Sequence, residues 1–285
     1  MSGGPFRTGL YVPGDRPDRF GSAESSGADL VVFDLEDAVA PERKAMARDA
    51  VMEWLRGGRR AAGSAATGAA DAGSDAGLRG DSTSVQVRVN AADDADLRAV
   101  AALPPAVGIR LPKVEHPSQI DRVVDITPGH PVIALLESAR GVLRASAIAE
   151  HPAVVSLALG ESDLRSDVGG GERMLEHARL TVLFAARAAG LPAPMASVFP
   201  AIRDLDGLDA DTRRAADLGL FGRMAVHPSQ LPVIAAVFSP TPAEVAWAEE
   251  VLAALAAGGV ATLASGEMVD PAMRARAERI RSLVS

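Results

Sequence analysis

Short β-rich segments alternate with helical segments along most of this chain, and the alternation limits its fold more than any other feature. The strand candidates are residues 7–12, 29–35, 84–90, 107–111, 131–136, 154–159, 195–199 and 221–226. Apolar residues recur at spacings of three and four, as in amphipathic helices, at 41–55, 95–103, 117–124, 144–149, 172–189 and 211–218. Strands that alternate with helices in this way predict an α/β protein, a closed (β/α)8 TIM barrel.

Two segments depart from the alternation. Residues 57–82 are rich in Gly, Ala, Ser and Asp and hold almost no large apolar side chain, so we expect a flexible insertion. Residues 239–285 follow the last strand candidate and contain helical patterns at 242–255 and 271–283. We therefore predict a catalytic barrel domain over 1–238 and a C-terminal helical extension over 239–285. The extension can serve as a lid over its own site or over that of a neighbouring subunit.

Composition excludes several classes of protein. The 285 residues carry a net charge of -8 and no basic cluster, which argues against a nucleic-acid partner. No apolar stretch reaches the length of a membrane span, and residues 1–10 lack the order of a secretory signal, so we expect a cytoplasmic protein without a membrane partner. The chain has 0 cysteines, which leaves carboxylates, histidines or carbonyls as the ligands of any metal.

Two carboxylates follow apolar runs that we expect to be buried strands. Glu137 ends the run Pro-Val-Ile-Ala-Leu-Leu-Glu, and Asp163 ends Val-Val-Ser-Leu-Ala-Leu-Gly-Glu-Ser-Asp. Neighbouring strands of a parallel barrel deliver such residues to the same mouth, where oxygen ligands suit Mg²⁺. The alternative is that each acid caps the helix after its strand. Glu161, beside Asp163, is a candidate third ligand or a hydrogen-bond partner.

Arg88 is a charged residue within an otherwise mostly apolar strand, Val-Gln-Val-Arg-Val-Asn. A buried guanidinium needs an anionic partner. This partner is either a substrate carboxylate or carbonyl, held by the planar fork, or an acid of the sequence Asp34-Leu35-Glu36-Asp37 in a structural ion pair. Strand alternation sends Asp34 and Glu36 to one side, where they can orient metal-bound water and the arginine. For Asp37 we favour a role at the start of a helix.

Other polar residues have a structural and a functional interpretation. Arg16 follows the first strand and can meet the phosphates of an anionic cofactor, or it can pair with Asp15 or Asp18. His227 precedes a proline and is a possible general base, although a hydrogen bond to a loop is the more frequent outcome.

Ordered short motifs carry a resemblance to a known family. They are Tyr11-Val12-Pro13-Gly14 with Arg16-Pro17, Asp34 to Val39 with Lys44 and Arg48, Arg88-Val89-Asn90, Leu111 to Glu115, Leu136 to Gly141, Gly160 with Asp163-Leu164, Val226 to Gln230, and Gly266 to Asp270. In these motifs the chain resembles the HpcH/HpaI aldolase and citrate lyase β-subunit family, in its stand-alone CitE-like branch. The resemblance covers nearly the whole chain except residues 57–82. The chain departs from the family at Gly21, where Lys is frequent, and at Ala196, where Asp is frequent.

The resemblance implies a Mg²⁺-dependent carbon–carbon lyase. Its substrates are β-hydroxyacyl-CoA thioesters such as citryl-, citramalyl- or malyl-CoA, and its products are acetyl-CoA and a keto acid (oxaloacetate, pyruvate or glyoxylate). Glu137 and Asp163 then hold Mg²⁺, and Arg88 binds the keto-acid half. Asp270 corresponds to an acid that reaches a neighbouring subunit's site, and Arg16 and Lys113 are candidate CoA contacts.

The resemblance also implies a homotrimer. Malate or citramalate synthase activity, with thioester hydrolysis, is a variant within the family. A class II aldolase acting on free 2-keto acids and a catalytically inert CitE-like subunit or binding protein stay open as alternatives.

Overall fold

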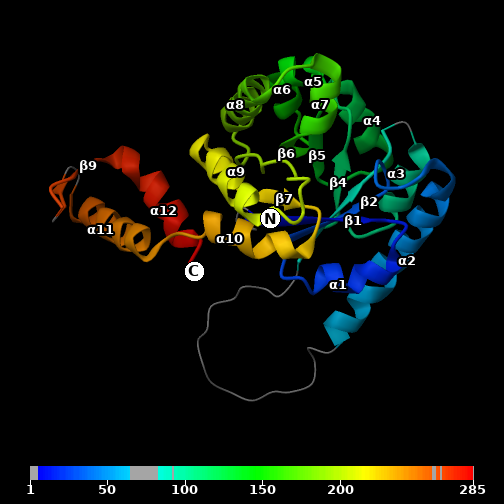
Figure 1. The fold of residues 1–285 in the computed structure, drawn as a ribbon, viewed down its shortest axis with the longest axis horizontal. Coiled ribbons are helices and arrows are strands. Elements are labelled where there is room, and N and C mark those ends of the chain that lie inside the picture. Colours follow the sequence, from blue (N-terminus) through cyan, green and yellow to red (C-terminus); the bar gives the residue numbers. More distant parts are fainter. Residues whose placement is uncertain (1–5, 65–82, 92, 259–260, 264, 285) are drawn as a thin grey trace.

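A parallel sheet of seven strands forms the centre of the protein (Figure 1). The computed structural model describes residues 6–64, 83–91, 93–258, 261–263 and 265–284. The strand order is β6-β5-β4-β3-β2-β1-β7. The strands are β1 (Thr8–Pro13), β2 (Leu30–Asp34), β3 (Ser84–Arg88), β4 (Gly108–Leu111), β5 (Val132–Leu136), β6 (Val154–Leu159) and β7 (Arg223–Ala225). The predicted α/β class and the parallel pairing are confirmed.

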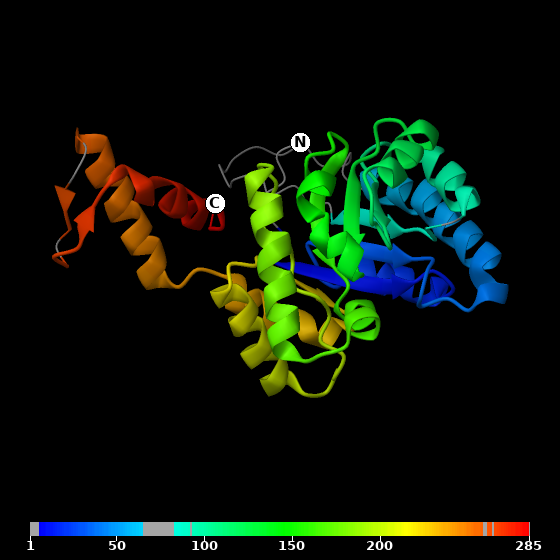
Figure 2. The same cartoon turned by 90° about the horizontal axis from the view of Figure 1, so that it is seen from above.

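Helices lie around the outside of the sheet (Figure 2). They are α1 (Phe20–Glu24), α2 (Lys44–Ser64), α3 (Asp94–Ala101), α4 (Ser118–Ile126), α5 (Ala139–Leu143), α6 (Ala145–Ala149), α7 (Glu161–Val168), α8 (Glu172–Ala188), α9 (Leu205–Asp217) and α10 (Leu231–Phe238), with short 3-10 turns η1 (Pro17–Arg19), η2 (Pro41–Arg43) and η4 (Pro228–Gln230). Alternate strand residues, among them Phe33, Ile109 and Leu136, are fully buried in the main hydrophobic core. These large side chains fix the register, because a shift by one residue would exchange the two faces of the sheet.

The other strand residues face the interior of the curved sheet and pack less completely. Leu30, Val32 and Met224 form one small apolar cluster, and Ile133, Leu135 and Ala158 form another. TIM barrels usually fill this space with layers of branched side chains. Here a cavity of about 1580 Å³ extends through it.

The predicted closed eight-stranded barrel is not confirmed. Within the described residues, the segment predicted as a strand over 195–199 contributes a single bridge, between Ala196 and Arg223. Toward β6 it provides a hydrogen bond from Ser197 Oγ to the carbonyl of Leu159. Pro192 and Pro194 lie just before this segment. Proline has no backbone N–H to donate to a neighbouring strand, which limits regular pairing on the N-terminal side of Ala196.

Gly222 allows the chain to turn into β7 close to the start of β1. Its φ is +80°, and a Cβ at this position would lie 2.1 Å from the carbonyl oxygen of Phe6. We expect Gly222→Ala to lower the free energy of unfolding by about 2–4 kcal/mol, because positive φ and a backbone clash both oppose it. Gly27 is the matched control, because its φ is also +80° but nothing lies within 4 Å. Urea unfolding of both variants checks this, and equal losses would contradict it.

The structure bears differently on the two segments that depart from the alternation, residues 57–82 and 239–285. Helix α2 continues to Ser64, so the first residues of the predicted insertion are helical, and residues 65–82 lie outside the described part of the chain. The C-terminal extension contains α11 (Pro242–Gly258), a hairpin of β8 (Ala261–Thr262) and β9 (Met268–Val269), η5 (Pro271–Met273) and α12 (Arg274–Ser282).

The extension has a hydrophobic core of its own and projects from the body formed by the parallel sheet and its helices (Figure 1). Only α10 and α11 together, as a bent pair, have the length and hydropathy of a membrane span; no single helix in the described residues has both.

Candidate functional site

Glu137 and Asp163 lie where strands β5 and β6 end. Glu137 directly follows β5 and is 5% exposed, and Asp163 lies in the first turn of α7. The helix-cap alternative fails for both. The N-cap of α5 is Ser138, whose side chain accepts a hydrogen bond from the backbone of Gly141. The N-cap of α7 is Gly160, without a side-chain cap.

Glu137 is held in an environment that favours its protonated form. Burial first, and then the charges of Asp163 and Glu36, raise the pKa of Glu137 to about 8. Asp163 is therefore close enough to Glu137 for its charge to raise that pKa. Glu137 Oε1 accepts a hydrogen bond of 2.8 Å from the backbone N–H of Lys113, which lowers that pKa only in part. Two acids that repel one another at close range are poised to accept a cation.

The backbone around this pair is shaped to accommodate it. A Cβ on Gly160 would lie 2.5 Å from Glu137 Oε2, so the glycine leaves room for the carboxylate. Lys113 adopts a left-handed conformation with φ 56°, and so directs its backbone N–H at Glu137. Non-glycine residues in this conformation are uncommon and recur at functional sites.

Arg88 is held by three acids, of which Asp34 ends β2 and Glu36 and Asp37 follow it. Its guanidinium makes a bidentate pair with Asp34, and Nη1 lies 3.0 Å from Glu36 Oε2 and 3.3 Å from Asp37 Oδ2. Asp34 also accepts the backbone N–H groups of Glu36 and Ala38, and so it fixes the loop after β2. The structural ion pair considered from the sequence is therefore formed, and Asp37 faces the arginine instead of starting a helix. Arg88 also lines the cavity, where a substrate could reach it. Its role toward a substrate stays a prediction.

Glu36 is buried and connects the arginine with Lys113. Its Oε1 accepts a bond of 2.6 Å from Lys113 Nζ. Its Oε2 has no hydrogen-bond partner in the described part of the chain, because the nearby Arg88 Nη1 does not have hydrogen-bond geometry. A buried oxygen without a donor can accept a hydrogen bond from a bound water.

These carboxylates fit a hard cation such as Mg²⁺. The described residues contain no cluster of three or more His, Asp or Glu side chains arranged to hold a metal. Mg²⁺ needs no such cluster, because it keeps several waters and binds one or two carboxylates together with substrate oxygens. Glu137 and Asp163 would provide these two carboxylates. A role of Glu36 toward metal-bound water stays a prediction, because its Oε2 is buried beside Arg88 at 3.0 Å.

The other predicted site residues have structural partners of their own. Arg16 binds Asp18 through bonds of 2.9 and 2.7 Å, which is the structural alternative considered from the sequence. Asp270 caps η5 by accepting the N–H of Ala272 and does not line the cavity formed by the described residues. His227 caps η4. The carboxylate of Glu161 is bound at both oxygens by Arg179, at 2.7 Å each, and is not free to serve as a third ligand.

Sequence interpretation missed two arginines in this region. Arg179 lies in the middle of α8, and only the fold brings it to Glu161. Arg110 is a charged residue within the apolar strand Gly-Ile-Arg-Leu, and it is 4% exposed. The pattern that drew attention to Arg88 could have identified Arg110 as well.

The cavity joins the acidic mouth to the interior of the sheet. Its walls include Arg88, Glu137 and Asp163 at the carboxyl ends of the strands, and Leu30 and Ile133 deeper inside. A ligand at the mouth is therefore bordered by carboxylates and a guanidinium, with an apolar space behind it.

Comparison with known proteins identifies the family. Residues 7–228 match the HpcH/HpaI aldolase/citrate lyase family model. The chain is 36% identical to a (3S)-malyl-CoA thioesterase of Cereibacter sphaeroides over 88% of this chain and 83% of that protein. It is 34% identical to a citrate lyase subunit beta-like protein of Mycobacterium tuberculosis over 94% of this chain and 92% of that protein.

Solved structures agree with this assignment. The CitE protein of Mycobacterium tuberculosis, in complex with magnesium, acetoacetate and coenzyme A, superposes with a TM-score of 0.75 at 31% identity, covering 99% of this chain and 98% of that one. The citrate lyase beta subunit of the same organism, complexed with oxaloacetate and magnesium, gives a TM-score of 0.65 at 32% identity over 82% of this chain and 97% of that one. The chain therefore belongs to the HpcH/HpaI aldolase/citrate lyase family.

Proposed function

We propose that this protein is a Mg²⁺-dependent carbon–carbon lyase. It cleaves or forms a β-hydroxyacyl-CoA, such as citryl-, citramalyl- or malyl-CoA, with acetyl-CoA and a keto acid as the other partners. The observation that supports this best is the close pair Glu137 and Asp163 at the cavity mouth, with the pKa of Glu137 raised to about 8. Relatives that bind magnesium, keto acids and coenzyme A support the same assignment.

Each residue of the mouth has a role in this reaction. Glu137 and Asp163 would hold Mg²⁺, which when bound acts as a Lewis acid on the oxygens of a hydroxy or keto acid. Arg88 stabilises negative charge on the keto-acid half, and Asp34 keeps its fork in one orientation. Glu36 holds Lys113 through Nζ, while 55% of the Lys113 side chain stays exposed to meet an anionic ligand such as CoA.

Asp270 is proposed to act on a neighbouring copy of the chain. Asp270 belongs to the described residues of the extension, 265–284. It does not line the cavity that the described residues of its own chain form. A carboxylate at that position can move the proton of the acetyl methyl carbon. Arg16 would have to leave Asp18 to contact CoA. The homotrimer and the cytoplasmic location stay predictions.

A panel of thioesters tests the function directly. Purified protein with Mg²⁺ is incubated with malyl-, citramalyl- and citryl-CoA, and acetyl-CoA and free CoA thiol are quantified separately. Release of acetyl-CoA with a keto acid is the expected result. Free thiol without acetyl-CoA would indicate a thioesterase, as in the Cereibacter relative. Cleavage of free hydroxy-keto acids alone would indicate a class II aldolase, and no turnover at all would indicate an inert subunit.

Mg²⁺ binding should depend on pH through Glu137. This carboxyl must lose its proton to hold a cation, so we expect Mg²⁺ affinity to rise with pH and to change most near its pKa of about 8. Isothermal titration calorimetry across pH about 6 to 9 checks this, because metal binding releases the proton. Affinity that is flat across this range would contradict the prediction.

The same shift has a consequence for stability without metal. Between its ordinary pKa of 4.5 and the folded value of about 8, Glu137 keeps a proton in the folded protein that it has lost in the unfolded chain. The free energy of unfolding contributed by this group therefore falls as pH rises through that window. Mg²⁺ should restore more stability above pH 8 than below pH 7, and Glu137→Gln should remove this difference.

A further inference from the structure

Arg110 is a buried guanidinium whose described partners are all neutral. Its side chain projects from β4 into the cavity and is 4% exposed. Nε and Nη2 donate to Gln86 Oε1 at 3.1 and 2.9 Å, and Nη1 donates to the Tyr11 hydroxyl at 3.2 Å. Nη2 also contacts the sulfur of Met224 at 3.9 Å. No carboxylate in the described residues forms an ion pair with it.

Neighbouring charges do not compensate Arg110. Asp34, Glu36 and Asp37 all lie against Arg88, and Glu36 also binds Lys113, so none of these acids forms an ion pair with Arg110. The Tyr11 ring lies 5.6 Å from the Arg110 guanidinium carbon, but it is shared with Arg88 at 5.2 Å. Arginine stays charged in proteins, and a buried charge without a counterion is costly.

The guanidinium retains capacity for an anion. Of its five N–H groups, three donate to Gln86 and Tyr11, and one makes only the weak contact with sulfur. Nη1 therefore has one N–H without an acceptor among the described residues, and Nη2 has one whose sulfur contact is easily displaced. A carboxylate can accept from two neighbouring N–H groups of a guanidinium.

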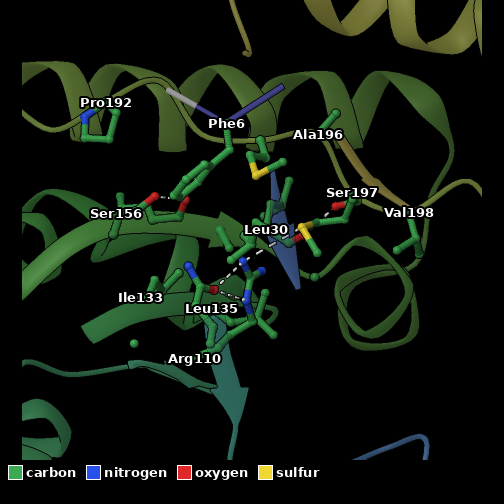
Figure 3. Close-up of a pocket in the computed structure, with 18 of the residues that line it drawn as sticks. Phe6, Leu30, Arg110, Ile133, Leu135, Ser156, Pro192, Ala196, Ser197 and Val198 are labelled. Atoms are coloured by element: carbon green, nitrogen blue, oxygen red, sulfur yellow. Dashed lines mark hydrogen bonds between the residues drawn. The ribbon is translucent and has the colours of Figure 1, made fainter. Parts of the chain in front are cut away.

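Apolar side chains surround this cation. Figure 3 shows Arg110 with Ile133 and Leu135 on one side of the cavity, and Phe6 and Pro192 across it. An anion that enters this space must bring an apolar body to fill it. Inorganic anions lack one, and the apolar side chains around Arg110 cannot replace their hydration.

We propose that the interior of the sheet is a binding site for an organic carboxylate with an aliphatic body, whose carboxylate pairs with Arg110. The aliphatic part lies among Phe6, Ile133, Leu135 and Pro192. This site lies deeper in the same cavity than the Glu137 and Asp163 pair and needs neither Mg²⁺ nor CoA, so it does not depend on the proposed lyase activity.

Direct binding measurements test the site with octanoate as the probe. Calorimetric titration of the full chain should give saturable binding, unchanged when EDTA is present. Octylammonium and 1-octanol have the same aliphatic body without the negative charge, and each should bind at least about tenfold more weakly. Inorganic phosphate should not compete. These ligand comparisons use the unaltered protein and therefore do not depend on the folding of any variant.

Variants then assign the binding to Arg110. Arg110→Gln should weaken octanoate binding by about tenfold or more, and Ala158→Leu, which narrows the cavity, should also weaken it. Arg140→Gln is the matched control, because the Arg140 side chain is 67% exposed on the surface, and its binding should equal that of the unaltered chain. Equal binding of octanoate and octanol, loss of binding in EDTA, or full binding by a folded Arg110→Gln variant would each overturn the proposal.

Discussion

Glu137→Gln and Asp163→Asn are each expected to reduce turnover of the hydroxyacyl-CoA substrate by about a thousandfold or more. Each change removes a negative charge from the pair that is proposed to hold Mg²⁺ and preserves the size of the side chain. The fold should persist, because Glu137 contributes no helix cap and an amide fits the same space. Steady-state kinetics, Mg²⁺ titration and thermal unfolding of the same preparations give the three readouts.

The matched control for this pair is Glu150→Gln, an exposed acid outside the cavity that should leave all three readouts unchanged. The melting temperature of Glu137→Gln should equal or exceed that of the unaltered protein without metal at pH 8, because a carboxyl whose pKa is raised to about 8 costs stability when it ionises. Full turnover in EDTA, or near-normal kinetics in either variant, would contradict the metal assignment.

Arg88→Lys is expected to reduce kcat/KM by about a hundredfold or more, although it preserves the charge. Lysine has no planar fork, so it cannot make the bidentate pair with Asp34 and at the same time face Glu36 and a substrate. Asp34 is 1% exposed, and losing one of its two guanidinium bonds removes a charge-assisted hydrogen bond from a buried carboxylate, which keeps only its backbone donors on that oxygen. We therefore expect a fall in the melting temperature as well as in activity.

The kinetic pattern separates these two effects. If Arg88 contacts the keto acid, the loss should persist at temperatures where Arg88→Lys is fully folded, and keto-acid binding measured by calorimetry should weaken in parallel. Arg140→Lys, an exposed arginine paired with Glu115, should behave as the unaltered protein. Unchanged kcat/KM in a folded Arg88→Lys variant would refute the assigned role.

Much of the fold could be predicted because it depends on local patterns. Seven of the strand candidates overlap observed strands, and the helical candidates 172–189 and 117–124 correspond to α8 and α4. Apolar runs between turn residues define such elements without knowledge of their partners. The segment over 195–199 has the same local pattern, but among the described residues it contributes only the bridge between Ala196 and Arg223.

Part of the candidate site could also be predicted from the sequence, because it depends on the order of the elements. Glu137 and Asp163 follow buried strands, and neighbouring parallel strands end at one edge, so their proximity follows from the order of the elements. The sequence could not decide whether each acid is a metal ligand or a helix cap. Next to Glu137 and Asp163, the residues Ser138 and Gly160 are also plausible N-cap residues, and only the structure shows which residue takes that position. The choice depends on backbone angles, which place Ser138 at the N-cap and leave Glu137 facing Lys113.

The sequence by itself determined the α/β class, the family and the pair of acids, since these depend on residue order and on local apolar patterns. Only the tertiary structure decided that Arg88 is held by Asp34, that Arg179 binds Glu161, and that Arg110 lies in a cavity without a carboxylate partner. Such pairings join residues 18 to 54 positions apart in the chain. Their distances, burial and pKa shifts arise from the packing of strands against helices, which no local pattern specifies.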